Sequence, residues 1–134
     1  MSAKKLHTAA AAGRVGEVRQ LLAAGVPIDA AERDGRTPLM AALTSCQYAA
    51  AEALITAGAD VHAADQRGES ALHHAASFAT PALVQKIVDR GADVNRKNQN
   101  GETPLLAALS ARIVEILLQA GADPGPVFLV GLAL

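Results

Sequence analysis

The sequence is poor in aromatic residues and carries no strong charge of either sign. Aromatic residues make up 2% of the 134 positions, although 51% of the residues are hydrophobic. A core with so few aromatics must rely on small aliphatic side chains, and alanine-rich segments favour closely packed helices. The 12 basic and 13 acidic residues give a net charge of -1, which leaves no basic field for a phosphate backbone. We therefore expect no nucleic-acid partner.

Signals for membranes and secretion are also missing. The longest apolar stretch, residues 127–134, is far shorter than the about 20 residues that a membrane span needs. The polar segment after the two N-terminal lysines does not resemble a secretory signal. Cys46 is the only cysteine, so no internal disulfide can form, and a reducing compartment fits best. We expect a cytoplasmic protein that does not enter a membrane.

No group of residues has the spacing of a catalytic, metal or cofactor site. His73 and His74 are adjacent, so on a helix their side chains diverge by about 100° and cannot easily share a metal ion. We expect His73 to be structural and His74 to lie on the inner face of a helix. Cys46 has no histidine partner in the sequence and is expected to be a small apolar filler. The sequence therefore predicts no enzyme, no metal and no cofactor.

The chain repeats itself every 33 residues. Segments that begin at residues 35, 68 and 101 read GRTPL, GESAL and GETPL, and a second series at residues 24, 57, 90 and 120 reads AGV, AGADV, RGADV and AGAD. A period of this length is typical of stacked structural repeats. The last repeat is three residues short, and we expect the loss to remove its inter-helix loop. A length of 134 residues fits one such array.

Each repeat predicts two helices and a hairpin. Thr37 and Thr103 precede prolines, so their hydroxyls are expected to cap the start of a short first helix. Glycines in the AG and RG pairs are suited to end the second helix, and the turns before residues 35, 68 and 101 to form tight hairpins. Apolar residues at i, i+3 and i+4 mark one buried face of each second helix: Val18/Leu21/Leu22, Ala51/Leu54/Ile55, Val84/Ile87/Val88 and Val114/Leu117/Leu118.

With TPL at residues 37 and 103, LH at residue 72 and GADVN at residue 91, the chain resembles an ankyrin-repeat protein over about residues 4–124. The resemblance implies an all-α repeat solenoid of four helix-turn-helix-hairpin repeats. Their expected bounds are residues 2–34, 35–67, 68–100 and 101–124, with an apolar tail or degenerate cap at 125–134. The first repeat lacks the Thr-Pro pair, as a terminal cap would.

Several positions depart from the family pattern. Cys46 and Ala79 stand where the first helix usually ends in glycine, so we expect those turns to adopt another conformation. Met40 and Leu106 replace the histidine that His73 retains, which removes part of the polar network between repeats.

The apolar tail leaves three alternatives open. It could fold back as a degenerate final helix over repeat four, dock on a second copy or a partner, or reflect truncation, because a terminal repeat normally shows water a polar face. We favour the first alternative and expect a monomer, with self-association through the tail as the second possibility.

The resemblance implies that partners contact the hairpin tips and the concave face of the first helices. Phe78 is the only aromatic residue on that face, and it either anchors a partner or fills space beside Ala79. The mixed charges of the tips favour a mixed-charge epitope. The candidate partner-binding residues are Arg33, Arg36, Ser45, Gln66, Arg67, Glu69, Ser77, Phe78, Arg96, Lys97, Gln99 and Glu102.

The function that follows is a non-enzymatic protein-protein interaction module, a scaffold or adaptor. The alternative is a small stand-alone inhibitor or immunity-type protein that blocks one enzyme or toxin, because the array begins near residue 4 and leaves no room for an effector domain.

Overall fold

A computed structural model describes residues 3–125. Within that range the fold consists of helices, with no strand beyond an isolated bridge between Ala64 and Ser70. None of these helices is long and apolar enough to cross a membrane. The all-α repeat solenoid is confirmed. The helices are α1 (Ala3–Ala12), α2 (Val15–Ala23), α3 (Pro38–Thr44), α4 (Tyr48–Thr56), α5 (Ala71–Phe78), α6 (Pro81–Asp89), α7 (Pro104–Ala107) and α8 (Ala111–Gln119).

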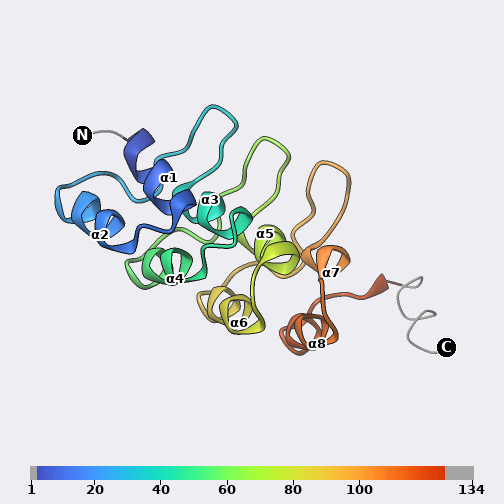
Figure 1. Ribbon diagram of the computed structural model, residues 1–134. Coiled ribbons are helices and arrows are strands. Elements are labelled where there is room, and N and C mark those ends of the chain that lie inside the picture. Colours follow the sequence, from blue (N-terminus) through green and yellow to red (C-terminus); the bar gives the residue numbers. More distant parts are fainter. Residues whose placement is uncertain (1–2, 126–134) are drawn as a thin grey trace.

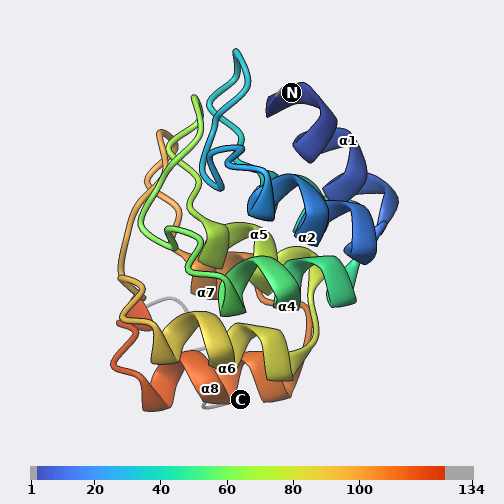
Figure 2. The same ribbon diagram turned by 90° about the vertical axis from the view of Figure 1, so that its left-hand side faces the viewer.

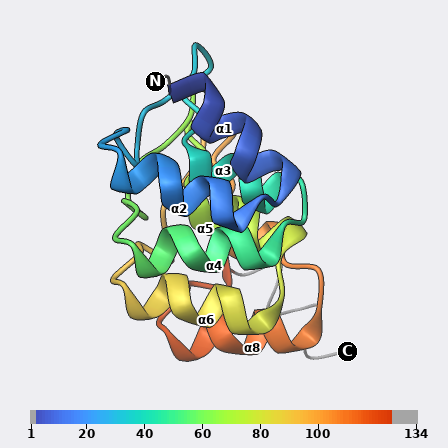
Figure 3. The ribbon, with the colours of Figure 1, turned by 60° about the vertical axis from the view of Figure 1, so that its left-hand side comes forward.

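The helices form two layers that run along the stack (Figure 1). The first helices α1, α3, α5 and α7 pack in one row, and the second helices α2, α4, α6 and α8 pack in the other, as Figure 3 shows from another side. The loops between repeats project to one side of the helices (Figure 2). The second and third repeats therefore contact a repeat on each side, and the first and fourth contact one repeat each within the described residues.

The core lies between the two layers and between successive repeats. Leu39, Leu72 and Leu105 stand at the same position of three first helices and are buried. Ala42 and Ala75, both 0% exposed, let neighbouring helices approach closely. The expected faces of the second helices supply the rest, and only that of α4 is buried throughout, since the others include the partly buried Leu21, Leu22, Val88, Val114 and Leu118.

The predicted capping hydrogen bond is present at Thr37 and absent at Thr103. Thr37 accepts a hydrogen bond from the Met40 amide at 3.3 Å, as expected. The prediction for Thr103 was wrong, because its side chain makes no capping hydrogen bond at the start of the shorter helix α7. In repeat three Ser70 takes this position, and its backbone amide donates to His73 Nδ1 at 3.1 Å. His73 thus has the structural role that was expected.

The turn between the two helices of a repeat was expected to change at both Cys46 and Ala79, and it changes at only one of them. Cys46 has a φ of 57°, close to the 75° of Gly13 one period earlier, so the chain keeps the left-handed turn although a side chain is present. Only Ala79 changes conformation, to an extended backbone with φ of -105°. The prediction that Cys46 is an apolar filler was also wrong, because its side chain is exposed.

The three-residue loss in repeat four falls on a helix. Helix α7 has 4 residues whereas α5 has 8, and residues 108–110 still connect it to α8. The expectation that the inter-helix loop would be lost was therefore wrong: a connection must span the distance between the layers, so the helix is shortened instead. The predicted placement of the tail concerns residues 126–134, which lie outside the described residues.

Side-chain amides join neighbouring hairpins. Gln66 donates from Nε2 to the Arg33 carbonyl at 3.0 Å, and Gln99 donates in the same way to the Gln66 carbonyl. Gly35 and Gly68 sit where the next hairpin passes, since a Cβ on either would lie 3.0 and 3.2 Å from the Cα of Asp65 and Asn98. The hairpins consequently form a close-packed row.

Candidate protein-binding groove

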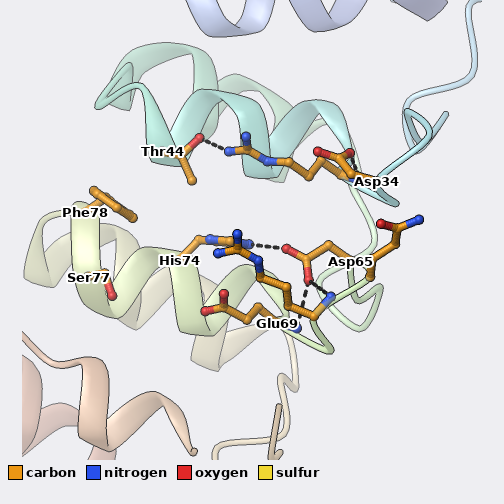
Figure 4. Close-up of a pocket in the computed structure, with 10 residues that line it drawn as sticks. Asp34, Thr44, Asp65, Glu69, His74, Ser77 and Phe78 are labelled. Atoms are coloured by element: carbon orange, nitrogen blue, oxygen red, sulfur yellow. Dashed lines mark hydrogen bonds and ion pairs between the residues drawn. The ribbon is translucent and has the colours of Figure 1, made fainter. Parts of the chain in front are cut away.

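A hollow of about 610 Å³ lies on the hairpin side between repeats two and three (Figure 4). Hairpin residues form one wall, and side chains of α3 and α5 form the other. Six of the predicted partner-binding residues line this hollow together with four that the prediction did not include. The lining residues are Asp34, Arg36, Thr44, Asp65, Gln66, Arg67, Glu69, His74, Ser77 and Phe78.

Two further hollows extend the groove toward the N-terminus. One of about 220 Å³ shares Arg36 and Thr44 with the main hollow and includes the predicted residue Ser45. Another of about 740 Å³ shares Asp34 with it and includes the predicted residue Arg33. The groove therefore runs from α1 to the C-terminal end of α5, with Arg36 at its centre.

Arg36 crosses the groove from hairpin to helix. Its Nη2 donates to Thr44 Oγ1, and its backbone amide donates to Asp34 Oδ1 at 3.0 Å (Figure 4). The Nε of Arg36 is buried and has no hydrogen-bond partner within residues 3–125. A buried donor without an acceptor costs free energy, so the position of Arg36 across the groove is maintained by its other contacts.

Asp65 and His74 form a buried pair at the floor of the groove. Nε2 of His74 donates to Oδ2 of Asp65 at 3.0 Å, and the two side chains are 9% and 7% exposed. Burial lowers the pKa of His74 below its ordinary 6.5, although Asp65 and Glu69 act in the opposite direction. His74 is therefore neutral at pH 7. The other oxygen of Asp65 accepts from the amides of Arg67 and Glu69, which fixes the hairpin.

Arg67 and Glu69 offer unused charges. Neither side chain makes a hydrogen bond or an ion pair within the described part of the chain. Since Asp65 is already bonded to His74 and the hairpin backbone, the accessible charges of the groove are two cations and two anions: Arg36, Arg67, Asp34 and Glu69. This balance fits a partner surface that carries both signs.

Phe78 ends α5 and lines the groove at its far end. It is 42% exposed, so it does not fill the space beside Ala79, which is itself buried. Its carbonyl accepts a hydrogen bond from the Tyr48 hydroxyl at 3.1 Å, which holds the backbone beneath the ring. Figure 4 shows Phe78 and Ser77 on the same helix as His74. The exposed ring is the apolar end of a largely polar groove.

The remaining predicted residues lie outside these hollows, toward the third hairpin. Arg96 donates from Nη1 to the His62 carbonyl at 3.0 Å, and Gln99 holds the preceding hairpin. Glu102 accepts from Asn98 through its carboxylate, and its carbonyl is the acceptor for His73 Nε2 at 2.9 Å. Lys97 is exposed. The structure therefore gives three of these four residues contacts within the fold.

The pairing of Asp65 with His74 was missed by the sequence analysis, although a signal was present. Ala41 and Ala107 occupy the position of His74 in the repeats before and after, so the histidine departs from its own array. The same position in repeat one is Thr8, so a titratable residue occurs there only in repeat three and indicates a local partner. Within residues 3–125 no cluster of His, Cys, Asp and Glu side chains could hold a metal ion.

The comparison with protein families gives a match over most of the chain. The model described as "Ankyrin repeats (3 copies)" matches residues 3–65 and, in a second overlapping match, residues 52–126. No curated protein matches the sequence.

Proposed function

Since this chain belongs to the ankyrin-repeat family, whose repeats generally serve as non-enzymatic protein-protein interaction modules, we propose that it binds a protein partner in the groove between repeats two and three. The observation that carries this proposal is the convergence in one hollow of six candidate residues, among them Arg36, Arg67, Glu69 and Phe78. The neighbouring hollows extend the surface that the partner covers.

The chemistry of the groove defines the partner's epitope. The side chain of Arg67 is a donor without an acceptor, Glu69 is an acceptor without a donor, and Arg36 is partly exposed. A carboxylate of the partner would bind the arginines, a basic or amide group would bind Glu69, and an apolar side chain would cover Phe78. Aromatic and arginine residues with these properties commonly dominate the free energy of binding.

The rigidity of the groove supports useful affinity. Its hairpin wall is held by Gln66 and Gln99, and its floor by the Asp65–His74 pair. A preformed surface loses little conformational entropy when a partner docks. Modest contacts at a few residues therefore suffice for specific binding.

Affinity capture from the source cells tests the proposal when two charge-matched variants are compared with the parent chain. Arg67→Ala with Phe78→Ala changes the groove, whereas Arg90→Ala removes one positive charge at an exposed residue outside the hollows. A protein retained by the parent and the control but lost by the groove variant is the expected result. Retention by all three would refute the groove as the binding site.

Titration calorimetry with the captured protein then gives the magnitude. We expect the groove variant to weaken binding by about 30-fold or more, since two hot-spot residues each contribute at least about 1 kcal/mol. An assay of the captured protein's own activity distinguishes recruitment, which leaves that activity intact, from inhibition, which abolishes it.

A further inference from the structure

The C-terminal end of the stack presents an apolar face. Helix α7 packs against α5 and α8, and α8 packs against α6 and α7, so within residues 3–125 no further helix follows them in the stack (Figure 1). Leu106 is 62% exposed and Leu109 is 70% exposed. The only other large hydrophobic residues that are exposed between residues 3 and 125 are Tyr48 and Phe78. Large leucines thus gather at this end of the molecule.

The repeat register shows that these positions are normally covered. Leu106 corresponds to Met40 and His73, which are 0% and 1% exposed because the following repeat packs over them. Val114 is partly buried, whereas its equivalents Val84 and Ala51 are 0% exposed. The end face therefore has the composition of an interface between repeats, and no further repeat covers it within residues 3–125.

The backbone next to the exposed leucines is held by hydrogen bonds to α5. The Leu109 amide donates to the Ala76 carbonyl at 3.1 Å, and the Ser77 hydroxyl donates to the Ala107 carbonyl at 3.5 Å. These bonds attach residues 107–109 to α5. The exposure of Leu106 and Leu109 is accordingly a property of the packed repeat.

We propose that residues 126–134 of the same chain bind this end face and cover it as a following repeat would. Their sequence, PVFLVGLAL, contains no charged or polar side chain and follows Gly125 directly. Nine residues span about 13 Å as a helix and about 30 Å when extended, either of which exceeds the roughly 6 Å length of a four-residue helix such as α7.

The covalent connection favours this occupant over a second copy. A segment attached at residue 125, six residues after the end of α8, is present at an effective concentration in the millimolar range, well above that of a separate molecule in a dilute solution. When the tail covers Leu106 and Leu109, the apolar surface of the tail and that of the end face are removed from water together. The residues that would contact the tail, Leu106 and Leu109, do not line the groove, so the inference can be tested independently of the proposed function.

Hydrogen–deuterium exchange of the full chain tests the inference. We expect the backbone amides of residues 126–134 to exchange at least about tenfold more slowly than in the free peptide. Leu106→Glu with Leu109→Glu removes this protection, since both leucines are exposed in the repeat itself and can be changed without unfolding it. The matched control, Ala49→Glu with Ala82→Glu, adds the same charge at exposed positions of α4 and α6 and retains the protection.

Light scattering over a concentration series completes the test. The parent chain should have the mass of one chain, and deletion of residues 126–134 should cause self-association that the two glutamates reverse. Unprotected amides in the parent chain, or protection that survives the leucine substitutions, would overturn the inference. Protection that disappears on dilution, together with a dimeric mass, would assign the face to a second copy.

Discussion

Repeats three and four begin with nearly the same motif but have different surroundings. GESAL is followed by the 8 residues of α5, and GETPL by the 4 residues of α7. Repeat three is packed on both sides, whereas repeat four has a neighbour on one side within the described residues. A starting motif therefore specifies where a first helix begins, and the neighbours and the available length determine how much of it forms and how well it is buried.

The largest contrast is expected for the leucine at the same position of each first helix. Leu72 is 0% exposed and Leu105 is 3% exposed. Leu72→Ala should lower the free energy of unfolding by about 3–5 kcal/mol, because the resulting cavity is enclosed on both sides. Leu105→Ala should cost about 2–3 kcal/mol, since the end of the stack can relax into the space. Urea titration of both variants checks this order, and equal losses would contradict it.

The hairpin glycines give the next contrast. Gly68 and Gly101 share a φ of 76°, but only Gly68 faces a following hairpin, and nothing lies within 4 Å of a Cβ on Gly101. Gly101→Ala should cost about 1–2 kcal/mol from the left-handed backbone alone. Gly68→Ala should cost roughly 1 kcal/mol more, because the methyl group meets the Asn98 backbone. Thermal unfolding of the two variants measures the difference, and a larger loss for Gly101→Ala would refute the assignment of the open end.

The stability of the chain is expected to depend on pH through His74, a residue that repeat four replaces by Ala107. The pKa of His74 is lowered in the folded chain, so the unfolded chain binds a proton more readily. The stability gained from the neutral imidazole is present in full above about pH 6.5 and is lost as the pH falls below that value. Urea midpoints at about pH 7.5 and about pH 5 should therefore differ more for the parent chain than for His74→Gln. Identical pH dependence in both would exclude a role for His74.

The smallest contrast concerns the helix caps. Thr37 accepts a hydrogen bond from the Met40 amide, and Thr103 makes no such bond. Thr37→Ala should cost about 1 kcal/mol, and Thr103→Ala should stay within about 0.5 kcal/mol. Chemical denaturation resolves the two values. A comparable loss at Thr103 would indicate that its hydroxyl caps α7 in solution.

The features that recur with the period could be predicted from the sequence. The 33-residue spacing indicated the helix pairs, and the glycines after the second helices have the positive φ that was expected, as for Gly58 and Gly91. These features are local, because they depend on the preferences of a few adjacent residues. Repetition makes each of them visible several times in one chain.

Features that depend on contacts between distant residues could not be predicted. The left-handed Cys46 keeps the turn of Gly13 because the helices on both sides require it, and no local preference of cysteine indicates this. Gln66 and Gln99 were expected on a binding surface, but they bond to the preceding hairpin one period away. Which side of a hairpin a side chain faces is decided by the stacking of repeats.

The glutamine bonds between hairpins have a consequence for how the array can be lengthened. Each of these repeats carries a donor for the repeat before it and a carbonyl for the repeat after it, and the bond spans one period. A duplicated copy of residues 68–100 inserted after residue 100 would carry its own glutamine one period after Gln99, and this glutamine could donate to the Gln99 carbonyl as Gln99 does to that of Gln66. The molecule is thus modular at its hairpins, and new binding surface can be added in whole units without redesigning the units already present.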